Sequence, residues 1–157
     1  MEELNRIKEI SQSIKRINQK FRLLKLLRIA KEEYDRNNYE GCVDTCLKIL
    51  ETHPENSVAL RGLGCAMQSL GKADEAIKCY EEALKYSDKK EIEYTLIGTV
   101  YYIQNRFEEA LQYYNLAIES NDDYDPAYEG RNQTMLERHL MLVDLQDELI
   151  EREIRGN

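Results

Sequence analysis

Cysteine and histidine are the scarcest residue types in this sequence that could bind a metal or carry redox chemistry, and it contains four cysteines and two histidines. Cys42 and Cys46 lie four positions apart in the stretch GCVDTC. That spacing by itself does not distinguish a metal half-site from a pair of packing residues. His53 and His139 have no partners nearby in the sequence that would suggest a catalytic triad or a metal motif. The glycines stand singly, without a phosphate-binding loop, so we expect no enzyme, no cofactor and no metal site.

The composition favours a helical protein. Two prolines and seven glycines among 157 residues leave few helix breakers, and 33% of the residues are charged. The longest uncharged stretch, between Glu93 and Arg106, is too short to span a bilayer. The N-terminus also lacks the layout of a signal peptide. We therefore expect a cytoplasmic protein without a membrane span, whose cysteines are thiols.

The charge is distributed unevenly along the chain. Residues 1–30 carry eight Lys or Arg against three Glu, a net charge of +5, so the net charge of −8 leaves −13 on the remainder. An acidic body repels phosphate, and the sequence therefore predicts no nucleic acid partner. Only the first helix could bind an anionic partner.

An internal repeat of 34 residues organises most of the chain. Three blocks align without gaps: 23–56, 57–90 and 91–124. Each block predicts two helices, the first over 23–36, 57–70 and 91–104 and the second over 39–52, 73–86 and 107–120. Asn37, Gly71 and Asn105 stand between them, and these residue types accept the left-handed conformation just past a helix end. One such hairpin cannot bury its apolar face alone, so stacked hairpins are expected to share a continuous core.

The repeat supplies an interpretation of the two cysteines. Cys42 stands where the other blocks have alanine, and Cys46 stands where they have tyrosine. The equivalent residues are Ala76 and Ala110, and Tyr80 and Tyr114. Both cysteines are therefore predicted to be small apolar residues of the core between the helices. Ile49 replaces an alanine of the other blocks, and our hypothesis is that it refills the space that Cys46 leaves.

Residues 23–124 resemble the tetratricopeptide repeat family. The stretches LGCAMQSLGKADEAIKCYEEAL and IGTVYYIQNRFEEALQYYNLAI carry its pattern most clearly. The resemblance implies an all-α fold in which three helix-turn-helix hairpins form a right-handed superhelical solenoid. Long N- and C-terminal helices are expected to flank these hairpins.

The resemblance also implies a concave groove lined by the first helix of each hairpin. The groove positions fall on Leu24, Leu27, Lys31, Tyr34 and Asp35, on Val58, Arg61, Cys65, Gln68 and Ser69, and on Ile92, Thr95, Thr99, Tyr102 and Ile103. This lining would suit an extended or helical peptide with apolar anchors. Members that hold the acidic C-termini of heat-shock chaperones use a clamp of Lys, Asn and Arg. Its places here hold Leu27, Lys31, Gly62, Ile92 and Leu96, so we expect no such clamp.

The first 22 residues are expected to form an amphipathic, basic helix. Its apolar residues alternate gaps of three and four, as in a heptad seam: Ile7, Ile10, Ile14, Ile17, Phe21 and then Leu24. Such a helix could cap the first hairpin, run continuously into it, self-associate, or meet an anionic surface. Isoleucine at both seam positions favours trimers or tetramers in parallel coils.

Residues 125–157 are predicted to form a C-terminal capping helix. Asp125 and Pro126 suit a helix start. Apolar residues at helical spacing imply one long helix to about residue 154: Leu136, Leu140, Val143, Ile150 and Ile154. The polar face of this helix would keep the open end of the repeat array soluble.

These features together predict a non-catalytic protein–protein interaction module, an adaptor or assembly scaffold whose groove binds a peptide of an unidentified partner. The alternative is a self-assembling structural module that forms a homo-oligomer through its N-terminal helix.

Overall fold

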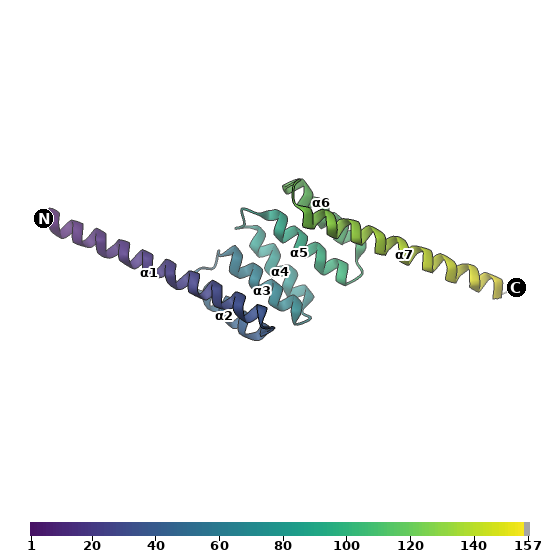
Figure 1. The fold of residues 1–157 in the computed structure, drawn as a ribbon, viewed down its shortest axis with the longest axis horizontal. Coiled ribbons are helices and arrows are strands. Elements are labelled where there is room, and N and C mark those ends of the chain that lie inside the picture. The colour runs from purple at the N-terminus through teal and green to yellow at the C-terminus, as the bar shows by residue number, and fades with distance from the viewer. Residues whose placement is uncertain (156–157) are drawn as a thin grey trace. The chain divides into compact units, whose positions relative to one another are not determined.

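The computed structural model describes residues 1–155, and this part of the chain consists of seven α-helices (Figure 1). They are α1 (Glu2–Asp35), α2 (Tyr39–Thr52), α3 (Ser57–Ser69), α4 (Ala73–Leu84), α5 (Lys90–Ile103), α6 (Phe107–Ser120) and α7 (Asp125–Arg155). The all-α fold and the three helical hairpins are confirmed. None of the helices within residues 1–155 has the length and apolar character needed to cross a membrane.

The turns within the three hairpins have the predicted conformation. Asn37, Gly71 and Asn105 have φ angles of 59°, 77° and 58°. In each turn the amide of this residue donates to the carbonyl three residues earlier, over 2.9 to 3.0 Å. Asparagine and glycine tolerate this left-handed backbone better than other residues, so these residue types end each first helix and direct the chain back along it.

The first compact unit, Met1–Tyr86, contains α1 to α4. Within it α1 packs on α2, α2 on α3, and α3 on α4. The core between the first three helices consists of Ala30, Cys42, Cys46, Leu63 and Ala66. Because most of these side chains are small, the helices approach closely.

The second unit begins at Ser87 and contains α5, α6 and α7. The start of α7 packs against both α6 and α5. Ala127 and Thr134 of α7 are fully buried. The first half of α7 therefore covers the third hairpin.

Both long helices extend beyond their own hairpins (Figure 1). α1 shows no break between residues 22 and 23, and every side chain from Met1 to Arg22 is exposed. Of the arrangements considered for the N-terminal segment, the structure therefore shows a helix that runs continuously into the first hairpin. The second half of α7 is exposed from residue 139 to residue 155 and caps nothing in its own unit. Residues 156 and 157 lie outside the described part of the chain.

Candidate functional site

An apolar cavity of about 410 Å³ lies in the first unit, between α1 and α3, with α2 at its base. Its lining residues are Leu27, Ala30, Lys31, Tyr34 and Asp35 from α1, Cys42 and Cys46 from α2, and Val58, Ala59, Arg61, Gly62 and Cys65 from α3. The cavity is largely apolar, and Lys31, Asp35 and Arg61 supply its charged groups. This combination of an apolar hollow with a few polar groups is typical of binding sites for side chains and small ligands.

The second unit shows what normally occupies the corresponding space. Tyr114 of α6 is almost completely buried, at 2% exposure. Its ring lies close to two glycines. A Cβ added at Gly98 would lie 3.1 Å from the ring, and a Cβ added at Gly130 would lie 2.4 Å from it. Its hydroxyl lies 3.1 Å from the Thr99 hydroxyl. One tyrosine thus joins all three helices of that unit.

Tyr80 of α4 has a similar position in the second hairpin. Its ring packs on Gly64, where a Cβ would lie 2.5 Å from Cε1. Its hydroxyl donates to Gln68 Oε1 over 3.0 Å and contacts Cys65 Sγ at 3.5 Å. Gln68 and Cys65 were both predicted groove residues, so the tyrosine of the second helix reaches the groove side of the first helix.

The cavity lies where the first hairpin lacks this tyrosine. Cys46 occupies the tyrosine position, and Ala30 replaces the glycine on which the ring would pack. Lys31 and Tyr34 stand at the positions of Cys65 and Gln68, and both line the cavity. A Cβ at Gly62 would lie 3.2 Å from Cys46 Sγ, as Gly130 lies beside Tyr114 in the second unit. The exchange of a large ring for a thiol has therefore left a hollow.

The hypothesis that Ile49 refills this space is wrong. Ile49 is fully buried, but the cavity remains and Cys46, not Ile49, lies on its wall. Alanine at position 30 takes up a little of the volume with its methyl group. The rest is open toward the groove.

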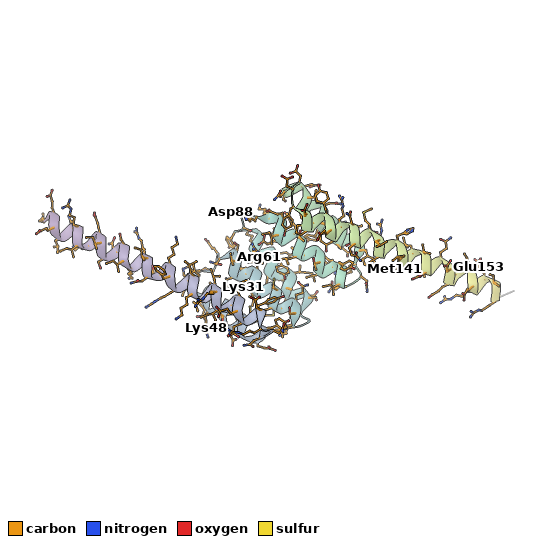
Figure 2. All side chains as sticks on the ribbon, viewed as in Figure 1. Lys31, Lys48, Arg61, Asp88, Met141 and Glu153 are labelled. Atoms are coloured by element: carbon orange, nitrogen blue, oxygen red, sulfur yellow. The ribbon has the colours of Figure 1, made fainter. Side chains whose placement is uncertain are left out.

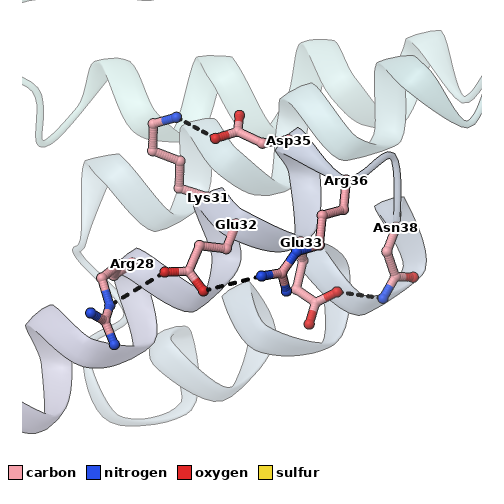
Figure 3. Close-up of polar contacts among 7 residues, drawn as sticks. All are labelled: Arg28, Lys31, Glu32, Glu33, Asp35, Arg36 and Asn38. Atoms are coloured by element: carbon pink, nitrogen blue, oxygen red, sulfur yellow. Dashed lines mark hydrogen bonds and ion pairs between the residues drawn. The ribbon is translucent and has the colours of Figure 1, made fainter.

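An ion pair and a hydrogen bond lie at the rim of the cavity. Lys31 on α1 pairs with Asp35 one turn later, as Figure 3 shows. The Tyr34 hydroxyl lies 3.2 Å from Ser69 Oγ, which joins α1 to α3 at one end of the cavity. Figure 2 labels Lys31 and Arg61, the cationic lining residues, on α1 and α3. Both can meet a carboxylate beside the cavity, although an exposed pair contributes little by itself.

Polar contacts around the end of α1 hold this wall in place (Figure 3). Glu32 lies between Arg28 and Arg36, with N–O distances of 3.5 and 3.9 Å. Asn38 donates to the Glu33 carboxylate and accepts from the backbone of Gly41 over 3.2 Å, which caps α2. The α1–α2 turn is therefore positioned by its own side chains.

Burial makes the thiols poor nucleophiles. Removal from water raises the pKa of Cys46 to about 12, and the neighbouring Cys42 adds to the shift. Desolvation also raises the pKa of Cys42 and of Cys79. Because the thiolate is the reactive and metal-binding form, these side chains act as small apolar residues, as predicted for Cys42 and Cys46. Within residues 1–155 no three Cys, His, Asp or Glu side chains form a group that could hold a metal ion.

The structure brings together most of the predicted groove residues of the first two hairpins. Leu27, Lys31, Tyr34, Arg61 and Cys65 all line the cavity. Gln68 contacts Tyr80 instead. The predicted groove residues Thr95, Thr99 and Tyr102 belong to the second unit, and none of them lines this cavity. Thr99 bonds to the Thr95 carbonyl over 2.9 Å, and Tyr102 packs on Phe107.

Sequence reasoning recognised that Cys46 leaves space but missed Ala30 and Gly62, which complete the cavity with it. The signal was present in the repeat, because the second and third blocks pair glycine with tyrosine while the first block pairs alanine with cysteine. The replacement of glycine by Ala30 and the replacement of tyrosine by Cys46 concern the same contact. Only the structure shows this, because there the ring of Tyr80 packs on Gly64.

Comparison with known proteins agrees with this geometry. Family models described as tetratricopeptide repeat match residues 57–90 and 94–124. The chain is a tetratricopeptide repeat (TPR) protein. It is similar to a TPR repeat-containing protein of Methanocaldococcus jannaschii, with 30% identity over 98 residues. That alignment covers 59% of this TPR protein but only 31% of the relative.

Solved TPR domains share the fold at low sequence identity. The Sgt2 TPR domain from Aspergillus fumigatus has a TM-score of 0.69 at 19% identity, and the match covers 75% of this chain and 80% of that one. The TPR2B domain of yeast Sti1, solved in complex with an Hsp70 peptide, has a TM-score of 0.68 at 13% identity, covering 74% and 98%. The first TPR of Spaghetti, bound to an Hsp90 peptide, has a TM-score of 0.67 at 18% identity, covering 74% and 93%. TPR domains are in general protein-interaction modules.

Proposed function

We propose that this TPR protein is a non-catalytic adaptor or scaffold and that it binds a peptide whose apolar side chain enters the cavity between α1 and α3. The observation that carries the proposal is the hollow at Cys46, which stands where the other hairpins hold a tyrosine ring. The apolar lining of this cavity suits an aromatic or large aliphatic side chain of a partner. The nearby Lys31 and Arg61 favour an acidic residue next to that anchor.

The cavity can supply a useful part of a binding free energy. Full burial of a large apolar side chain contributes about 1.5–3 kcal/mol, which is roughly a ten- to hundredfold change in the dissociation constant. Interfaces commonly depend on one such anchor surrounded by weaker polar contacts. The exposed groove residues beside the cavity supply those weaker contacts.

Chaperone peptides of the kind bound by some TPR neighbours do not suit this groove. Two of the clamp places in the first hairpin hold Leu27 and Lys31, and Leu27 is part of the apolar wall. Gly62 has no side chain to offer. The peptide we propose is therefore selected by an apolar anchor rather than by a carboxylate clamp.

The test uses a displayed library of random peptides selected on the full chain. We expect the selected peptides to share a Phe, Tyr or Leu, and to lose at least tenfold in affinity for the variant Ala30→Gly/Cys46→Tyr, in which a tyrosine occupies the cavity. Leu47→Tyr is the matched control, because it adds the same side chain at a half-exposed position of α2 outside the cavity. Selected peptides that bind both variants as tightly as the wild type would place the binding site elsewhere.

A second measurement reports on the cavity without a peptide. Toluene and p-cresol imitate the side chains of Phe and Tyr, and each should shift the amide NMR signals of residues around Cys46 in the wild type. The same titration of Ala30→Gly/Cys46→Tyr should leave those signals in place. Equal shifts in both proteins, or none in the wild type, would contradict an accessible cavity.

A further inference from the structure

The two projecting helix halves each expose an apolar stripe. The α1 stripe consists of Ile7, Ile10, Ile14, Ile17, Phe21 and Leu24, whose side chains are 53–67% exposed. The α7 stripe consists of Leu136, Leu140, Val143, Ile150 and Ile154, which are 40–70% exposed. Exposed apolar surfaces of this extent usually mark an interaction site.

The two stripes match in spacing and in length. Both alternate gaps of three and four residues, with Asp147 at the one interrupted position of the α7 stripe. At 1.5 Å per residue, the α1 stripe is about 26 Å long and the α7 stripe about 27 Å long. Helices with such stripes pair side by side through them as a coiled coil.

The charges of the two helix halves are opposite. Residues 6–25 of α1 carry seven Lys or Arg and one Glu, a net charge of +6. Residues 137–155 of α7 carry six Asp or Glu and three Arg, a net charge of −3. Figure 2 labels one of these acids, Glu153, on the projecting half of α7. An α1–α7 pair would therefore attract, whereas α1–α1 and α7–α7 pairs would place like charges together.

The charges beside the stripes select the same pairing. Helical spacing places Lys20 and Lys25 on the two sides of the α1 stripe, and Glu151 and Glu153 on the two sides of the α7 stripe. All four side chains are exposed. In coiled coils the residues that flank the seam determine the choice of partner. Glu151 pairs with Arg155 on its own helix, but such an exposed pair is weak enough to exchange.

We propose that the α1 stripe of one copy of this chain binds the α7 stripe of a second copy as a two-helix coiled coil. Reciprocal pairing between two copies gives a closed dimer, and pairing with successive copies gives an open chain. This proposal is independent of the peptide cavity, because none of its residues lines that cavity. Asp147 weakens the pair, since a polar residue at a seam position lowers the stability of a coiled coil.

The experiment is sedimentation velocity of the full chain over a hundredfold range of concentration, with two charge-reversal variants. Lys20→Glu/Lys25→Glu makes the flanks of both stripes acidic, and Glu151→Lys/Glu153→Lys makes both basic. We expect the wild type to associate as its concentration rises, and the association of each variant alone to weaken at least tenfold. An equimolar mixture of the two variants should associate again, because each α1 then meets an α7 of opposite charge. Circular dichroism of each variant checks that its helices persist.

Further variants and outcomes distinguish the alternatives. Asp147→Leu should strengthen association, whereas Leu47→Ala, on the half-exposed face of α2, should leave it unchanged. A chain that stays monomeric throughout, or variants that associate as well as the wild type, would overturn the proposal. Loss of association in Lys20→Glu/Lys25→Glu, while Glu151→Lys/Glu153→Lys associates as well as the wild type, would indicate α1–α1 pairing and would overturn it as well. Binding to phosphatidylserine vesicles without self-association would assign α1 to a membrane surface instead.

Discussion

Replacing Ala30 by glycine and Cys46 by tyrosine in the same chain should stabilise the first unit. The pair recreates the arrangement of Gly98 and Tyr114, whose ring is almost fully buried. A buried tyrosine covers 150–250 Å², and a gain of about 100 Å² over the thiol, at about 25 cal/mol per Å², gives about 2.5 kcal/mol. Glycine within α1 costs about 1 kcal/mol. The expected net gain is about 1.5 kcal/mol in the free energy of unfolding.

The single changes should behave differently from the pair. Cys46→Tyr alone brings the ring against the methyl of Ala30, as a methyl at Gly64 would lie 2.5 Å from Tyr80. Such overpacking costs about 1–3 kcal/mol and cancels most of the gain. Ala30→Gly alone should lower the stability by about 1 kcal/mol and enlarge the cavity.

Urea denaturation of the wild type, both single variants and the double variant measures this coupling. We expect the double variant to be more stable than the sum of the single changes by about 1–3 kcal/mol. The same measurement on Cys46→Tyr/Ile49→Ala should show a further loss of about 2–5 kcal/mol, because Ile49 is fully buried and does not line the cavity. Single changes that add to within about 0.5 kcal/mol would refute the linkage of positions 30 and 46. A rescue by Ile49→Ala would refute our interpretation of the cavity.

Three further predictions follow from glycine and thiol environments. Gly71→Asn should change the free energy of unfolding by less than about 0.5 kcal/mol, since asparagine holds the same φ in the other turns, while Gly71→Val should cost about 1–2 kcal/mol. Gly130→Ala should destabilise the chain by about 1–3 kcal/mol in thermal denaturation, although alanine favours helix, because its Cβ would lie 2.4 Å from the Tyr114 ring. A stabilising effect of Gly130→Ala would contradict that contact. The pKa of Cys46, about 12 in the folded chain, lies above the unfolded value of about 8.5, so the unfolded state loses its proton first. The contribution of Cys46 to the stability should therefore be constant below about pH 8, and the stability should fall by roughly 1 kcal/mol per pH unit between about pH 9 and 12, less steeply in Cys46→Ala. Urea midpoints that do not change between about pH 7.5 and pH 10 would contradict the burial of this thiol.

The repeat made much of the fold predictable. Position-by-position comparison of three blocks identified the hairpins, and asparagine or glycine at each turn marked where the first helix ends. The cysteines at positions 42 and 46 could also be assigned to the core, because the equivalent residues are alanine and tyrosine. Groove positions were predicted from the resemblance, and seven of the fifteen predicted residues line one cavity.

The cavity itself could not be predicted, because its volume depends on three helices at once. Ala30, Cys46 and Gly62 come from α1, α2 and α3, and each is unremarkable in its own helix. The volume of the cavity is the volume of the tyrosine ring that the repeat geometry accommodates, minus the volume that the side chains of Ala30 and Cys46 fill. Ile49 looked like a compensating residue in the sequence, but its side chain occupies a different part of the core.

The amino-acid sequence by itself determined the helices, their turns and the apolar stripes of both long helices, since these depend on residues a few positions apart. The tertiary structure decided which of these surfaces are covered. It buries the first half of α7 against α6 and leaves the second half exposed, although the apolar spacing continues through both. Likewise α1 continues from the first hairpin to Glu2 without turning back onto it. Periodicity shows that a helix has an apolar face, but only the positions of the neighbouring helices determine whether that face meets protein or water.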